Sequence, residues 1–151
     1  MDSPLISEFL KDHQLFSRLL LEISKLLEQG KIEDARKRAR ELDILAGPHI
    51  AYEESELYPR LAELGEEMAT EAALVDQHHE ALDAVKLLAG RRLLSESEVD
   101  AIKTGIQDAI SHAEHCGTLI SLLTQLDDDQ QNESLAILKR LRVEGKKWTE
   151  L

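Results

Sequence analysis

Short connections between long amphipathic segments are the feature that most constrains how this chain can fold. Four segments carry apolar residues at helical spacing, and the breaks between them lie near residues 30, 65 and 90–95. Because short connections make consecutive helices antiparallel neighbours, the pattern predicts an all-α, up-down-up-down four-helix bundle. The predicted helices cover about residues 4–29, 32–64, 66–89 and 95–126.

Residue types suited to helix ends support these limits. A Ser-Pro pair at residues 3–4 fits the N-cap and first turn of the first helix, and the run Ser-Glu-Ser-Glu at 95–98 is a capping-box pattern. Glycines at 30, 65 and 90 are the predicted stops. The Gly-Pro pair at 47–48 removes one backbone hydrogen bond, so we expect the second helix to kink or restart just before His49.

The C-terminal part is predicted to add a short fifth helix to the bundle. The polar run at residues 127–132 indicates a solvated break, and a shorter helical pattern with Leu135, Leu138 and Leu141 follows it. The tail that contains Trp148 is expected to be loosely held. The length indicates a single domain over residues 1–151, with the bundle in 3–126 and the C-terminal helix and tail in 130–151.

Composition and charge exclude several classes of partner. The sequence is 42% hydrophobic but 3% aromatic, a balance rich in good helix formers that suits helices packed on helices. A formal net charge of −12 leaves no basic face to neutralise phosphates, which argues against nucleic acids and anionic membranes as partners. No stretch approaches the roughly 20 apolar residues that span a bilayer. A single cysteine, Cys116, and an N-terminus without signal-peptide features predict a cytoplasmic protein.

Each predicted helix carries a histidine near its middle. These histidines are His13, His49, His78 with His79, and His112, and Glu53 follows His49 by one helical turn. Residues four apart share a helix face, so His49 and Glu53 can bind the same ion or adjacent ions. Imidazole and carboxylate groups in an apolar bundle suit iron, manganese or zinc, whereas calcium takes oxygen ligands. The pattern therefore predicts a metal site inside the bundle.

Each of these residues also has an ordinary structural interpretation. A single histidine on an apolar helix face is more often a hydrogen-bonded core residue than a metal ligand, and acidic residues are mostly solvated. Glu54 and Glu56 are expected to face solvent. The recurrence of a central histidine in all four helices is what favours the metal interpretation.

The segment from His49 to Pro59, His-Ile-Ala-Tyr-Glu-Glu-Ser-Glu-Leu-Tyr-Pro, resembles the second-helix motif of the hemerythrin-like, or HHE cation-binding, family. An early histidine in the first helix and another in the third extend the likeness, which covers about residues 3–126. The resemblance implies a bundle around a non-haem iron centre, usually with two ions. The ligands that it implies are His13, His49, Glu53, His79 and His112.

The third helix offers His78 as well as His79, and both fall within its apolar arc on a helical projection. Geometry alone therefore does not choose between them. Leu82 and Val85 follow His79 by three and six residues, which repeats the spacing of apolar residues after His13, so His79 is preferred and His78 is the alternative ligand.

The fourth helix departs from the family pattern. It reads His112-Ala-Glu-His115-Cys116, so Cys116 stands where the family has a second carboxylate. On a helical projection Cys116 lies on the core face, whereas Glu114 and His115 lie outside it. Three outcomes stay open: Cys116 binds metal as a thiolate, the site holds one ion or two unequal ones, or metal binding is lost and Cys116 is an ordinary buried thiol. His115 is a further alternative ligand, expected to be exposed or to support a ligand.

The resemblance implies a protein that binds or senses dioxygen, nitric oxide, or the redox or iron state. An enzyme that processes peroxide or nitric oxide at the same centre is the alternative, and a metal-free helical interaction module is a third hypothesis. The sequence has no nucleophilic constellation and no glycine-rich phosphate loop, so no catalytic residue is predicted. The expected partner is a small diatomic ligand or peroxide, and zinc or manganese is the alternative to iron.

Overall fold

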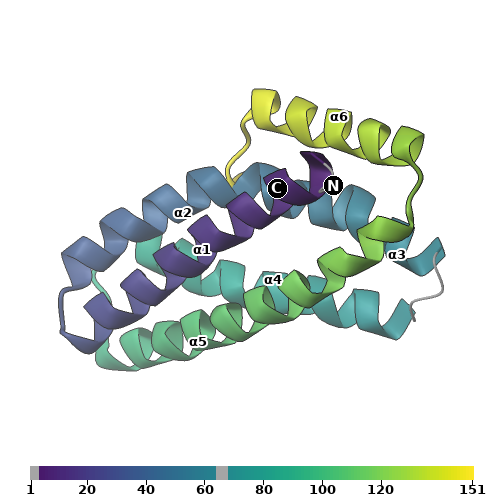
Figure 1. Ribbon diagram of the computed structural model, residues 1–151. Helices are drawn as coiled ribbons and strands as arrows, with labels where there is room; N and C mark the ends of the chain where they lie inside the picture. The colour runs from purple at the N-terminus through teal and green to yellow at the C-terminus, as the bar shows by residue number, and fades with distance from the viewer. Residues whose placement is uncertain (1–3, 64–67) are drawn as a thin grey trace.

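Four long helices form the body of the molecule. The computed structural model describes the backbone of residues 4–63 and 68–151, and the side chains of the same residues except 61, 68–74 and 114–122. The long helices are α1 (Pro4–Glu28), α2 (Ile32–Tyr52), α4 (Met68–Ala89) and α5 (Glu96–Leu119). Helix α1 packs on α2 and α5, and α4 packs on the same two helices, so the four close into a ring. Figure 1 shows that their directions alternate, which confirms the predicted up-down-up-down bundle.

The second predicted helix is divided into three elements. After α2, a π-helical turn, η1 (Glu53–Leu57), leads into α3 (Tyr58–Glu63). The expected restart before His49 is wrong, because α2 runs unbroken through Gly47 and Pro48. The departure from α-helical geometry lies further on, in η1. Pro59 has no N–H to donate to the carbonyl four residues earlier, and in a regular α-helix its ring would clash with that carbonyl, which lies inside η1. The predicted N-cap at residue 3 and the stop at residue 65 lie outside the described residues.

Side-chain caps start the last two helices. The predicted capping box is confirmed in α5: the Ser95 hydroxyl accepts from the backbone N–H of Glu98 at 3.2 Å, and the Glu98 carboxylate accepts from the N–H of Ser95 at 3.0 Å. Helix α6 (Asp128–Glu144) begins with a second box, made by Asp127 and Gln130. The run at 127–132 is accessible to solvent as expected, but the break is shorter than predicted, because α6 already begins at Asp128. The carboxylates of this run lie at a helix N-terminus, where the helix dipole favours negative charge.

Helix α6 lies across one end of the bundle, over α2 and the beginning of α1 (Figure 1). The buried hydroxyls of Tyr52 and Ser134 are 2.6 Å apart and join α2 to α6. Arg142 of α6 donates to the carboxylates of Glu8 and Asp12 on α1, at 2.9 and 3.0 Å. The predicted fifth helix is thus confirmed, and its polar contacts attach it to two helices of the bundle.

The segment after α6 returns to the bundle. Gly145 takes a left-handed φ of 64°, which ends α6 and turns the chain back toward α2. The short 3₁₀-helix η3 (Trp148–Glu150) follows, and the Trp148 side chain is only 6% exposed, within the main apolar core. The prediction of a loosely held tail is therefore wrong, because the buried indole of Trp148 and the hydrogen bonds from Thr149 to Asp43 anchor this segment.

The buried apolar side chains form two clusters. The larger fills the four-helix ring, and the smaller lies under α6 and α3. Phe9 of the smaller cluster stacks on His13 and packs on His49, with ring centroids 4.6 and 4.5 Å apart. The polar centre described below therefore lies where the two apolar clusters meet. Among the described residues, no helix is long and apolar enough to cross a membrane.

Candidate metal centre

One imidazole from each long helix points into the middle of the bundle. His13 comes from α1, His49 from α2, His78 from α4 and His112 from α5, and Glu53 opens the π-helical turn. All five side chains are buried. The structure therefore brings together four of the five residues predicted as ligands, with His78 in place of His79.

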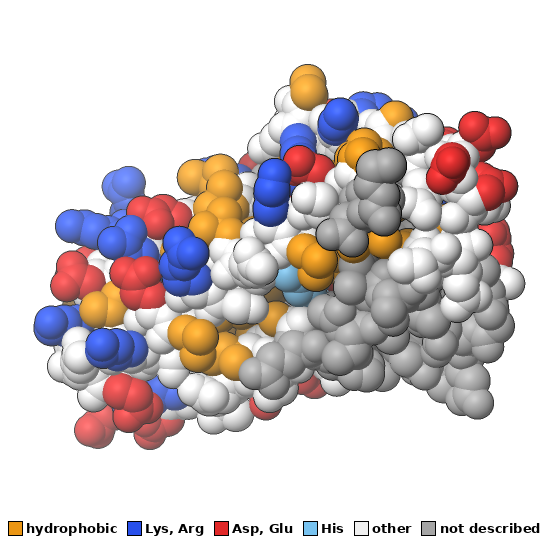
Figure 2. Space-filling model, viewed as in Figure 1, with side chains coloured by type: hydrophobic (Ala, Val, Ile, Leu, Met, Phe, Trp, Pro, Cys, Tyr) orange, Lys and Arg blue, Asp and Glu red, His pale blue; other side chains and the backbone are white. Residues whose placement is uncertain are grey.

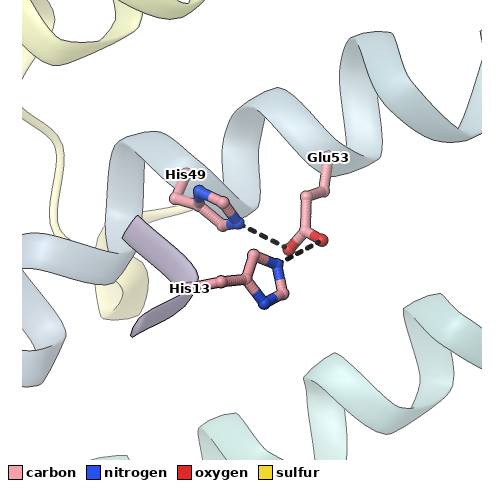
Figure 3. A group of neighbouring side chains, drawn as sticks. All are labelled: His13, His49 and Glu53. Carbon is pink, nitrogen blue, oxygen red and sulfur yellow. Dashed lines mark ion pairs between the residues drawn. The ribbon is translucent and has the colours of Figure 1, made fainter. Parts of the chain in front are cut away.

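His13, His49 and Glu53 form the most compact group, and Figure 3 shows the two imidazoles turned toward the carboxylate. One potential ligand atom from each lies within 4.8 Å of the other two. The Nε2 atoms of His13 and His49 are 3.8 and 3.5 Å from the carboxylate oxygens. Among the described residues, neither nitrogen has a hydrogen-bond partner, although both are buried.

His78 extends this group toward α5. Its Nε2 lies 3.5 Å from Oε1 of Glu53 and 3.1 Å from the hydroxyl of Tyr58. Its ring meets that of His112 edge to face, with centroids 4.4 Å apart. The Tyr58 hydroxyl also donates to Oε2 of Glu53 at 3.4 Å. Glu53 therefore lies between imidazoles on both sides of the bundle.

The preference for His79 is not supported by the structure. The His79 side chain is exposed, whereas that of His78 is 2% exposed. His78, Ala81, Val85 and Leu88 follow each other by three or four residues, so they form one buried stripe along α4. The spacing argument relied on Leu82, which is only partly buried. The orientation of α4 against its neighbours decides between adjacent histidines, and the sequence alone does not contain it.

Three of the imidazoles are held by acceptors that are not among the predicted ligands. Nδ1 of His49 lies 3.1 Å from Asp12, Nδ1 of His78 lies 3.2 Å from Glu54, and Nδ1 of His112 lies 2.6 Å from Gln77. An acceptor at Nδ1 favours the tautomer that carries the proton on that nitrogen, and it turns Nε2 toward the centre, where it can serve as a donor atom for a metal. These contacts cross between helices or turns, so sequence spacing gives no signal for them.

The expectation that Glu54 and Glu56 face solvent is wrong. Both are partly buried, Glu54 against His78 and Glu56 against Arg60. The π-helical turn accounts for this difference, because it moves the side chains from Glu53 onward away from their positions in a regular α-helix. Glu54 thereby contacts an imidazole on the neighbouring helix.

The charges of the cluster favour an ionised carboxylate. Burial opposes ionisation of Glu53, but the imidazoles of His49, His13 and His78 outweigh it and hold the pKa of Glu53 well below its usual value. Burial would likewise raise the pKa of Asp12, but hydrogen bonds from His49 and Arg142 lower it. An ionised Asp12 can only accept, so His49 carries its proton on Nδ1.

The pKa of His78 depends on the same two opposing effects, burial and neighbouring charges. Burial works to lower it, but the carboxylates of Glu53 and Glu54 raise the pKa of His78 to about 9. Without a metal, this imidazole is therefore a cation at neutral pH. A metal ion at the cluster would take over the positive charge that the protonated imidazole supplies.

A small, partly open chamber adjoins these side chains. It has a volume of about 40 Å³, and the four imidazoles and Glu53 share its wall with apolar side chains that include Phe16, Leu42 and Trp148. A single water needs roughly 10–15 Å³ of such space, so the chamber can hold a molecule of a few atoms. His13 also borders a surface groove between α1 and α5. Figure 2 shows histidine surface in a hollow between apolar side chains on this face.

The remaining candidate ligands lie outside the described side chains. They are His115 and Cys116, and the same holds for Glu114. Their backbone belongs to α5, which continues to Leu119. Ligation by Cys116 therefore stays a prediction.

Comparison with known proteins identifies one family. The family model described as "Hemerythrin HHE cation binding domain" matches residues 5–123, a span that contains Glu53 and the four histidines of the cluster. Comparisons with curated proteins and with solved structures give no match. The matched span ends before α6 and the segment that carries Trp148.

Proposed function

Because this chain belongs to the hemerythrin HHE cation-binding domain family, we propose that it holds non-haem iron in the His/Glu cluster and uses that centre as a binding or sensing site. The ligand is dioxygen or nitric oxide, or the centre responds to the redox or iron state of its surroundings. The proposal combines the family membership with the chemistry of the buried donors.

The observation that carries the proposal is the pair of buried imidazole nitrogens on His13 and His49. Neither has a hydrogen-bond partner among the described residues, and both face the buried carboxylate of Glu53. A buried polar atom without a partner costs about 1–3 kcal/mol. A bundle that served only to pack helices would gain stability by replacing them with apolar side chains. A cation gives both nitrogens a partner, so the residues present fit a metal.

The donor set offers enough nitrogen and oxygen atoms for two ions, which His13, His49, His78 and Glu53 would hold. Oε2 of Glu53 faces His13, and Oε1 faces His49 and His78. A carboxylate with imidazoles at both oxygens is suited to bridge, and His112 beside His78 adds a further nitrogen donor. Mixed nitrogen and oxygen donors suit iron, with manganese and zinc as alternatives. Bound iron would supply a redox change and a position open to a diatomic ligand.

The protein side of the mechanism is orientation and exclusion of water. Asp12 holds His49 with Nε2 directed at the cluster, and Glu54 does the same for His78. Tyr58 donates a hydrogen bond to Glu53 and lies beside Nε2 of His78, so it can offer a proton at the centre. The apolar wall of the chamber favours a small uncharged ligand over ions.

The test is nitric oxide binding by protein loaded anaerobically with ferrous iron. We expect an iron–nitrosyl absorption and EPR signal in proportion to bound iron. Glu53→Gln should lose both the iron and the signal, whereas Glu56→Gln, which removes only a partner of Arg60, should retain them. Iron retention without any response to nitric oxide or dioxygen would contradict the binding function. Rapid turnover of peroxide by the same preparation would decide for the enzymatic alternative.

A further inference from the structure

Part of the chamber wall comes from a segment that lies outside the span matched by the family. The matched span is residues 5–123, and Trp148 follows it by a helix and a turn. The indole nonetheless lines the same chamber as the imidazoles and Glu53, and η3 packs against both α2 and α4. An aromatic side chain of this size removes a large part of the space that the bundle leaves beside its polar centre.

Specific contacts on α2 hold this segment in place. The carboxylate of Asp43, 6% exposed, accepts hydrogen bonds from the backbone N–H and the hydroxyl of Thr149, at 2.8 and 2.9 Å. At Gly47 a Cβ would overlap the carbonyl oxygen of Lys146 and lie 2.7 Å from the carbonyl carbon of Lys147. Glycine at this position therefore permits backbone to pack directly on α2.

Asp43 and Gly47, which make these contacts, lie within two turns of the candidate ligand His49 on α2. Gly47 precedes His49 by two residues, and Ala46 and Ile50 line the chamber beside His49 and Trp148. The segment after α6 is thus packed on α2 at the level of His49 and the candidate metal centre. Its position determines how much space remains next to the imidazoles.

We propose that residues 145–151 close the chamber beside the metal centre, and that Trp148 sets the size of the external ligand that the centre admits. The inference rests on the proposed metal function. A chamber of about 40 Å³ has room for roughly three water-sized atoms, which is enough for a diatomic or linear triatomic molecule and less than the five ring atoms of imidazole need. Trp148 is therefore a specificity-determining residue, which acts by filling space and not by touching the metal.

The first experiment compares a small and a larger ligand on protein loaded with cobalt(II), whose visible spectrum reports ligand binding. Azide and free imidazole are titrated into the wild type, Trp148→Ala and Trp148→Phe. We expect azide affinity to stay within about twofold, while imidazole affinity rises by about tenfold or more in Trp148→Ala, because steric exclusion is relieved. Trp148→Phe should show a smaller rise in imidazole affinity. This variant provides the test if Trp148→Ala does not fold.

The matched control is Leu88→Ala. Leu88 is fully buried in the same core cluster but does not line the chamber, so its truncation loosens the core without enlarging the ligand space. It should leave the ratio of imidazole to azide affinity unchanged. An unchanged ratio in both Trp148 variants at wild-type cobalt content, or an equal rise in Leu88→Ala, would overturn the inference.

A second experiment needs no metal. Trp148 is the single tryptophan of the chain, so its fluorescence reports this segment alone. In metal-free protein, dissolved oxygen should quench the emission while acrylamide, which is larger and polar, should not. Asp43→Ala should admit acrylamide and shift the emission to the red. Acrylamide quenching of the wild type at the level of free tryptophan would overturn the inference. Failure of the wild type to bind any metal would refute the proposed function alone.

Discussion

Replacement of Asp12 tests whether the hydrogen bond that holds the His49 imidazole contributes to metal affinity. Asp12→Ala removes the acceptor that lies 3.1 Å from Nδ1 of His49, and His49 then loses both its orientation and its fixed tautomer. A hydrogen bond to a charged group contributes about 1.5–3 kcal/mol. Loss of a supporting carboxylate of this kind costs about 10–100-fold in metal affinity, or roughly 1.4–2.7 kcal/mol. We expect the dissociation constant for ferrous iron or cobalt(II) to rise by that factor, measured by competition with a chelator of known affinity.

Glu8→Ala is the control for this experiment. Glu8 and Asp12 both accept from Arg142, at 2.9 and 3.0 Å, and both are partly exposed on the same face of α1. Only Asp12 also contacts His49, so Glu8→Ala should weaken the attachment of α6 and leave metal affinity within about twofold of the wild type. Equal losses of metal affinity in the two variants would contradict a role for the Asp12–His49 contact. They would show that the loss comes from a weaker attachment of α6 and not from a change at the imidazole.

Three further predictions follow from neighbouring contacts. Glu54→Gln should lower metal affinity by about 10-fold through His78, whereas Glu56→Gln should leave it unchanged; chelator competition measures both, and equal effects would contradict the assignment. In metal-free protein, the raised pKa of His78, about 9 against about 6.5 in the unfolded chain, stabilises the fold fully below about pH 6.5, and this contribution is lost as the pH rises through about 9. Urea unfolding across this range should show the loss in the wild type, and an equal loss in His78→Gln would contradict it. Gly47→Ala should destabilise the protein by about 1–3 kcal/mol despite the better helix propensity of alanine, and should shift Trp148 emission to the red; unchanged emission would show that the close packing is not needed.

The bundle could be predicted from the sequence because local signals define it. The cap at Ser95, the short connections and the apolar periodicity all act within a few residues of each other. The position of the segment after α6 could not be predicted in this way. Trp148 lines the chamber together with residues about a hundred positions earlier, such as Leu42 and Ala46, and its neighbour Thr149 donates to Asp43. A short polar stretch with one aromatic residue has no periodicity that predicts such packing.

The candidate centre likewise has a part that local spacing predicts and a part that depends on contacts between helices. His49 and Glu53 share a face by helical spacing, and the structure brings them together as expected. The choice of His78 over its neighbour depends on how α4 is rotated in the bundle. The support from Asp12 depends on the register of α1 against α2, and Cys116 lies beyond the described side chains. Spacing along one helix thus predicts a pair of ligands, while contacts between helices complete the site.

The most direct test of the central claim is the metal content of the full chain. After anaerobic reconstitution with ferrous iron and removal of free metal, elemental analysis of the wild type should give at least about one iron per chain, and about two if Glu53 bridges. His49→Ala and Glu53→Gln should each fall well below one while circular dichroism shows that the helices remain. Wild-type protein that is folded but retains far less than one ion per chain, or variants that retain as much iron as the wild type, would contradict a metal centre built on these residues.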